Sequence, residues 1–65
     1  MNPNRLLAPP VVAEHLDVSV QRLAEWRHKD IGPNYVKVGR LIRYRAEDVA
    51  TWLDAQTVQT AGGAA

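Results

Sequence analysis

The sequence has no cysteine, which excludes both disulfide bonds and thiolate metal sites as supports for the fold. It also has no apolar run near the roughly 18 residues that a membrane span needs. The N-terminal stretch MNPNRLLAPP lacks the charged start and long apolar middle of a signal peptide. We therefore expect a cytoplasmic protein that does not bind a membrane.

Residues for catalysis and metal binding are also scarce. The two histidines, His15 and His28, are isolated, and two histidines without cysteine do not make a closed zinc site. No nucleophile–base pair or carboxylate dyad stands out, and a chain of 65 residues offers little room for a pocket. We expect no enzymatic activity, no metal and no cofactor.

The chain is long enough for one small domain, and its charged residues are unevenly distributed along the sequence. A domain of this size buries only about 60% of the surface of its unfolded chain, so its core is thin. Residues 20–45 hold seven basic and two acidic residues, a net charge of +5, whereas the rest of the chain holds one basic and five acidic residues, a net charge of −4. A basic segment in a small domain is typical of nucleic-acid binding, although an ordinary mixed surface explains the charges about as well.

The first half of the chain predicts two short helices. The stretch PPVVAEHL predicts a helix over 9–16, because proline suits a first helical turn and Val12 and Leu16 share a face. Ala8 is a poor cap for this helix. After a tight turn at Asp17, Ser19 is a good N-cap for a second helix over 20–29, which Gly32 and Pro33 end.

Two helices joined by so short a turn predict a helix-turn-helix. Val20, Leu23 and Trp26 form a stripe spaced by three that should pack inward. The polar and basic residues early on the outer face of the second helix lie where a recognition helix meets base edges.

The stretch YVKVGRLIRY, residues 35–44, predicts a β-hairpin around Gly39. A two-residue turn at 39–40 mixes polar and apolar residues on both faces of the ribbon. A three-residue loop over 39–41 pairs Val38 with Ile42 and Lys37 with Arg43, which leaves one apolar face and one basic face. We favour the three-residue loop because register follows the hydrophobic pattern. A phosphate backbone lying between Lys37 and Arg43 would then offset their repulsion.

The remaining boundaries follow from the same patterns. A last helix over about 46–56 has Val49, Trp52 and Leu53 on its apolar face and acidic residues in its first turn. Both tryptophans and Tyr44 should lie in the core. Residues 1–8 are expected to be a flexible lead-in, 9–56 the folded domain and 57–65 a disordered tail.

Over residues 7–54 the chain resembles a known group. The stretches VVAEHLDVSVQRLAEWR and GPNYVKVGRLIRYRAEDVATWL resemble the small winged helix-turn-helix proteins of the excisionase and MerR-like group, most of all short phage excisionases, also called recombination directionality factors. The resemblance implies a small α+β fold with three short helices and a two-stranded wing. It also implies that the second helix enters the major groove of DNA and the wing enters the adjacent minor groove.

The resemblance also implies the residues that contact DNA. The contacts from the second helix are Ser19, Gln21, Arg22, Glu25 and Arg27. Those from the wing are Lys37, Gly39, Arg40 and Arg43. Arg40, at the tip of the wing, is the strongest candidate, because an arginine in the minor groove reads groove width and negative potential. Asp17 departs from the usual glycine of the turn. Glu25 is an unexpected acidic residue on the DNA-facing side of the second helix. Its carboxylate repels phosphate but can accept a hydrogen bond from a cytosine amino group.

An excisionase of this kind binds tandem sites in attachment DNA cooperatively, bends the DNA and directs the phage integrase toward excision, inside the host bacterium. Its expected partners are attachment-site DNA, the integrase and further copies of itself, with Val11 among the expected contacts between copies. A short prophage transcription regulator with the same fold is the alternative. An adaptor for an acidic protein is a third hypothesis, which salt-sensitive DNA binding would exclude.

Overall fold

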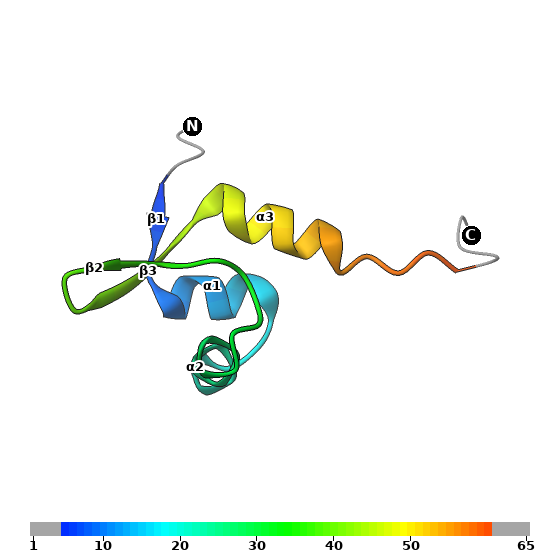
Figure 1. Ribbon diagram of the computed structural model, residues 1–65. Coiled ribbons are helices and arrows are strands. Elements are labelled where there is room, and N and C mark those ends of the chain that lie inside the picture. The colour runs from blue at the N-terminus through cyan, green and yellow to red at the C-terminus, as the bar shows by residue number, and fades with distance from the viewer. Residues whose placement is uncertain (1–4, 61–65) are drawn as a thin grey trace.

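The computed structural model describes residues 5–60 of the 65-residue chain, and these form a small winged helix-turn-helix of the α+β class. The elements follow in the order β1 (Leu6–Leu7), α1 (Pro9–Leu16), α2 (Val20–His28), β2 (Val36–Val38), β3 (Leu41–Arg45) and α3 (Ala46–Ala55) (Figure 1). The strands form an antiparallel sheet in the order β1-β3-β2. No helix within residues 5–60 is both long enough and apolar enough to cross a membrane.

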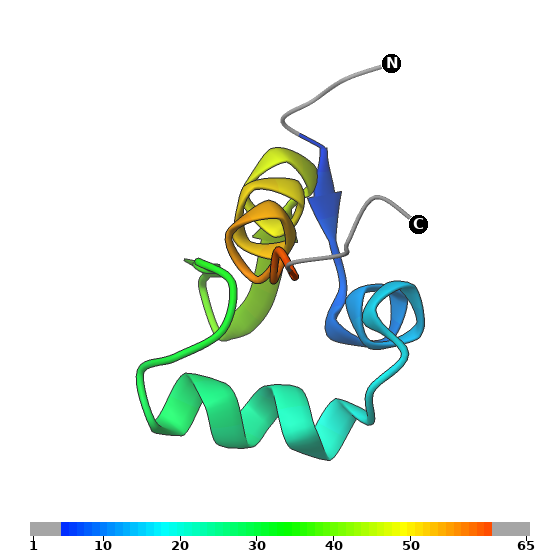
Figure 2. The ribbon, with the colours of Figure 1, turned by 90° about the vertical axis from the view of Figure 1, so that its right-hand side faces the viewer.

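The two N-terminal helices meet at the turn that the sequence predicts. Asp17 ends α1 in the left-handed conformation, with φ 58° and ψ 44°, and the Val18 amide donates to the Ala13 carbonyl at 2.9 Å. Aspartate adopts this conformation more readily than most residues, because its short polar side chain can bond locally. The turn sets α2 across the end of α1, so that α2 forms one side of the molecule (Figure 2).

The core is as thin as the chain length predicts. It consists of Val12 and Ala13 from α1, Leu23 from α2, Tyr44 from β3 and Val49 from α3, each at most 3% exposed. One prediction about the core needs adjustment. Tyr44 is buried as expected, but Val20 is 47% exposed, because residues spaced by three drift around a helix of 3.6 residues per turn.

The tryptophans pack at the border of this core. The rings of Trp26 in α2 and Trp52 in α3 lie with centroids 5.3 Å apart and their planes tilted by 43°, which is a favourable arrangement for an aromatic pair. Both residues are half-buried. The pair joins the C-terminal half of α2 to α3, so the prediction that the tryptophans serve packing is confirmed.

A third strand extends the sheet beyond the predicted hairpin. Leu6 pairs with Arg45 and Leu7 with Tyr44, and the Arg5 carbonyl accepts from the Ala46 amide at 3.0 Å. The predicted lead-in of residues 1–8 is therefore too long, since its last part belongs to the folded domain. A strand of two residues has too short a pattern to be recognised without its partner. Residues 1–4 of that lead-in and 61–65 of the predicted tail lie outside the described residues.

The register of the wing hairpin, β2 and β3, differs from the favoured prediction. Val36 pairs with Arg43, Lys37 with Ile42 and Val38 with Leu41, so the turn has two residues, Gly39 and Arg40. Gly39 has φ 64°, as a glycine at the first central position of a tight hairpin turn requires. The predicted pairing of Lys37 with Arg43 is wrong, and so is the basic face that it implied.

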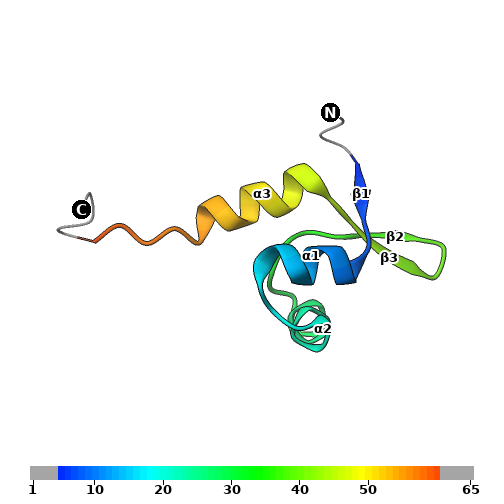
Figure 3. The same cartoon turned by 180° about the vertical axis from the view of Figure 1, so that it is seen from behind.

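The reason for this difference is that the wing projects away from the core (Figures 1 and 3). Burial specifies register strongly only where one face of a sheet is covered. Val38 and Leu41, next to the turn, are 48% and 54% exposed, so the hydrophobic pattern has little influence on their pairing. The turn decides the register instead, and Lys37 and Arg43 each pair with an aliphatic residue.

Candidate nucleic-acid interface

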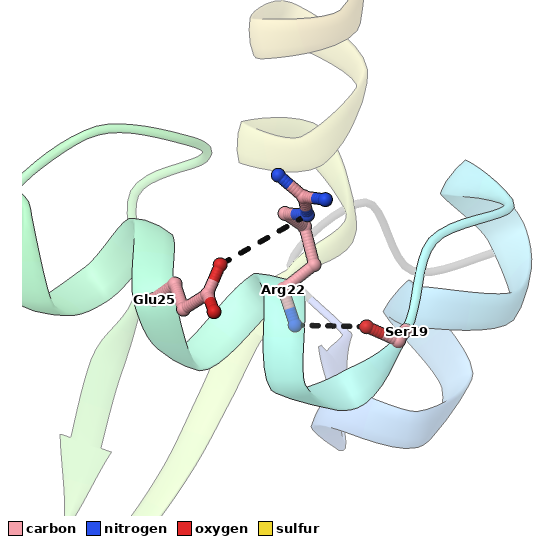
Figure 4. Close-up of polar contacts among 3 residues, drawn as sticks. All are labelled: Ser19, Arg22 and Glu25. Carbon is pink, nitrogen blue, oxygen red and sulfur yellow. Dashed lines mark hydrogen bonds and ion pairs between the residues drawn. The ribbon is translucent and has the colours of Figure 1, made fainter.

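Ser19 begins α2, and its hydroxyl caps the helix as predicted. Its Oγ accepts a hydrogen bond from the Arg22 amide at 2.9 Å (Figure 4). The other free amides of this first turn carry the positive end of the helix dipole toward the surface. This end of α2 therefore suits an anionic partner such as a phosphate.

Polar side chains occupy the exposed surface of α2 after this cap. Gln21, Arg22 and Glu25 are all exposed. Arg22 Nε lies 4.0 Å from Glu25 Oε1, and both side chains are 60% exposed. Figure 4 shows that the two terminal nitrogens of Arg22 point away from Glu25. An ion pair so exposed contributes little to stability, so both groups can be redirected toward a ligand at low cost.

Arg27 is oriented differently from the other predicted contacts of α2. Its Nη1 donates to the Tyr44 hydroxyl at 2.8 Å, and its guanidinium lies 5.8 Å and 6.0 Å from the ring centroids of Tyr35 and Tyr44. The side chain is half-buried between α2 and the base of the wing. The structure thus gives Arg27 an internal partner that the sequence pattern did not suggest.

The wing presents its basic residues in three directions. Arg40 lies in the turn at the tip and is exposed. Lys37 pairs with Ile42, so these two share one face of the ribbon, whereas Arg43 lies on the other face with Val36. Arg43 is half-buried and its Nη1 donates to the Ile42 carbonyl at 2.6 Å. A ribbon with a cation at its tip and one on each face is suited to a groove with phosphates on both sides.

A family model described as a helix-turn-helix domain matches residues 6–57, and so covers both α2 and the wing. The chain belongs to this helix-turn-helix domain family. A comparison with curated proteins finds no match. Membership in the helix-turn-helix domain family supports sequence-specific DNA binding as the function.

The helix-turn-helix domain has further surface features outside the predicted set of DNA contacts. Arg45, at the start of α3, forms an ion pair with Asp48, Nη1 to Oδ2 at 3.4 Å. Leu6, Val38 and Leu41 expose aliphatic surface on the face of the sheet that points away from the core. No local pattern predicts which way the three aliphatic side chains face, because this depends on the wing register and on the pairing of β1.

Metal-ligand residues do not converge within the helix-turn-helix domain. Among residues 5–60, no three side chains of His, Asp or Glu come close enough together to hold a metal ion. His15 and His28 are both exposed and lie on different helices. Cationic side chains are thus the main chemical feature of α2 and the wing.

Proposed function

We propose that this protein is a small phage excisionase, a DNA-binding protein that does no strand chemistry itself. It binds tandem sites in attachment DNA, bends the DNA and directs the integrase toward excision in the bacterial host. The observation that carries the proposal is the joint presentation, in one small helix-turn-helix domain, of an exposed polar α2 and a basic wing. The full resemblance over residues 7–54 supports the excisionase role in particular.

In this proposal α2 enters the major groove and the wing enters the adjacent minor groove. Gln21 and Glu25 meet base edges, where Glu25 accepts from a cytosine amino group. The N-terminal end of α2 at Ser19 meets a phosphate. Arg40 enters the minor groove, and Gly39 lets the backbone of the tip approach its walls without a side chain.

The phosphate contacts come from both elements. Arg22 serves α2, while Lys37 and Arg43 each contact one of the two strands that border the minor groove, since they lie on opposite faces of the ribbon. Together with Arg40 in the minor groove, these cations neutralise about four phosphates, so log K should fall with log salt with a slope near −4. A single module that makes so few contacts binds weakly, and tandem binding with self-association compensates for this.

The charge distribution along the molecule supports head-to-tail self-association. Residues 36–45 carry four basic residues and no acidic one. Of the three acidic residues in 46–58, Glu47 and Asp48 lie in the first turn of α3, next to β3, and Asp54 lies toward its C-terminal end. The wing projects at one end of the molecule and the C-terminal end of α3 points the opposite way (Figures 1 and 3). Two unlike surfaces at opposite ends make an open, repeating contact rather than a closed dimer.

The test is the electrophoretic mobility of a labelled phage attachment-site fragment, titrated with protein in excess competitor DNA. The wild type should give a ladder of cooperative, bent complexes, and Arg40→Ala should weaken every one of them. Gln59→Ala, a change in the exposed segment after α3, is the control that should leave the ladder intact. A wild type with no salt-sensitive affinity for any DNA would contradict the proposal.

A short prophage transcription regulator is the second candidate. The match to a helix-turn-helix domain over 6–57 fits it equally well, because DNA binding by this domain is common to both proposals. The same titration separates the two, if a promoter fragment is run beside the attachment-site fragment. Specific binding at the promoter alone favours the regulator.

A further inference from the structure

Arg27 connects the two elements that the proposed function assigns to DNA. It lies in the last turn of α2, and its Nη1 donates to the hydroxyl of Tyr44 in β3 at 2.8 Å. Its guanidinium also lies 5.8 Å from the ring centroid of Tyr35, immediately before β2. One side chain of α2 therefore contacts both legs of the wing at their base.

The partners of this contact hold it in one geometry. Tyr44 is 1% exposed, so its hydroxyl needs a partner inside the protein, and Arg27 supplies it. The two tyrosine rings pack against each other with centroids 6.1 Å apart, and the guanidinium lies within about 6 Å of both. A planar guanidinium that bonds one phenol and lies near two aromatic rings has little freedom to rotate.

Among the described residues, the bond from Arg27 to Tyr44 is the one side-chain hydrogen bond between α2 and the wing, while Leu23 of α2 joins Tyr44 in the buried core. In the described residues, α2 packs mainly on α1, and β3 packs on α1, α3 and its neighbouring strands. The chain from α2 to β2 is an irregular segment that includes Gly32 at φ 86°. Arg27 is thus a direct side-chain link between the recognition helix and the wing.

We propose that Arg27 is a positioning residue: through Tyr44 and Tyr35 it sets the wing relative to α2, so that both reach their grooves at once. This inference rests on the proposed DNA-binding function and replaces the predicted phosphate contact of Arg27. Its guanidinium acts through the two tyrosines. The positive charge by itself is not the feature that matters, because the geometry of the guanidinium makes the contact.

Four variants separate positioning from phosphate contact. Arg27→Lys keeps the charge but loses the planar fork, and Tyr44→Phe keeps the ring and the arginine but loses the hydrogen bond. Arg27→Met leaves the buried phenol without its hydrogen-bond partner, which destabilises the fold. The double variant R27M/Y44F removes both polar groups, so no buried group is left unpaired. Circular dichroism, recorded at the temperature of the binding assay, establishes that each variant is folded.

The expected result is that R27K and Y44F each lower affinity for a specific site about tenfold, which corresponds to about 1.4 kcal/mol. R27M/Y44F should bind no more weakly than R27M. R27K and Y44F, which keep every charge, should lower the salt slope along with the affinity, because the cations of the displaced wing lose phosphate contacts. Arg40→Ala should cost less in the Y44F background than in the wild type, because the wing tip is already misplaced. Gln21→Ala should cost the same in both backgrounds, since α2 itself still reaches the major groove.

Two results would overturn the positioning role. If R27K and Y44F bind like the wild type while R27M lowers the salt slope by about 0.9, Arg27 contacts a phosphate directly. If all four variants change only the midpoint of thermal unfolding and not the affinity of the folded protein, the contact merely stabilises the fold. A wild type without salt-sensitive DNA affinity is a separate outcome, which refutes the proposed function and the positioning role with it.

Discussion

Lys37 and Arg43 lie on opposite faces of the wing, because Lys37 pairs with Ile42 and Arg43 with Val36. The two cations are therefore not forced together across the ribbon, and no bound anion is needed to hold them. Repulsion between facing like charges destabilises a strand pair, and the observed register avoids it. The wing thus offers cationic side chains to both walls of a groove.

This arrangement predicts that Lys37→Ala and Arg43→Ala weaken DNA binding independently. Each contact to a separate strand should contribute about one unit to the salt slope, and the losses of the double variant should add to within about 0.5 kcal/mol. The measurement is fluorescence anisotropy of labelled DNA over a series of salt concentrations. Strongly non-additive losses would mean that both side chains contact one phosphate, against the observed register.

Alanine at Gly32 should destabilise the protein more than alanine at Gly39. Both glycines have positive φ, 86° and 64°, so either substitution carries a backbone penalty of about 1–2 kcal/mol. At Gly32 an added Cβ would also lie 3.1 Å from Cβ and Cε3 of Trp26, whereas nothing lies within 4 Å at Gly39. Thermal unfolding measures the difference, since about 1 kcal/mol shifts the midpoint of a domain of this size by about 4–8 °C. Equal midpoints for the two variants would contradict the close packing of Gly32 on Trp26.

Ser19→Ala should lower the free energy of unfolding by about 1 kcal/mol, because the Arg22 amide loses its acceptor. Ser19→Asp is the matched control: its carboxylate can cap the helix and suits the positive end of the dipole. Chemical denaturation should therefore distinguish alanine from aspartate. The aspartate variant should nevertheless bind DNA more weakly, because its charge repels the phosphate proposed to lie there. Unimpaired DNA binding by Ser19→Asp would place that phosphate elsewhere.

Charge reversal of Asp54, near the C-terminal end of α3, should remove cooperativity on DNA. Asp54→Lys changes the exposed C-terminal half of α3, which is proposed to meet the basic wing of a neighbouring copy. The first complex in a mobility assay should form as in the wild type, but the ladder of further complexes should require more protein. Glu14→Lys makes the same charge change on α1. If that variant alone loses cooperativity, the contact runs through α1, where Val11 is 52% exposed; if neither does, charge does not drive self-association.

The helices are the part of the fold that the local sequence predicted best. The bounds of α1 were predicted to the residue and those of α2 and α3 to within one residue. The turn at Asp17 and the cap at Ser19 were also predicted and are confirmed. These features depend on groups within four residues of one another, so the sequence window that forms them also contains their signal.

The candidate interface was predictable in composition but not in orientation. Gln21, Arg22, Glu25, Lys37 and Arg40 are exposed, as residues that contact a ligand must be. Arg27 and Arg43 have the same charge but are half-buried and bonded to other groups of the protein. Nothing in the local sequence distinguishes the half-buried Arg27 from the exposed basic residues, since its hydrogen-bond partner lies 17 residues away.

The sequence by itself determined the helix-turn-helix, its caps and the concentration of positive charge between residues 20 and 45, because each of these depends on residue type and short spacing. Only the tertiary structure decided the register of the wing, the pairing of β1 with β3 and the direction of Arg27. For the wing register, the physical reason is that the tip of the wing stands clear of a core of five buried residues. The other two features depend on partners far away in the sequence. Where no core covers a strand, the hydrophobic pattern does not fix its register, and the turn geometry does so instead. The orientation of Arg27 is fixed by its hydrogen bond to Tyr44.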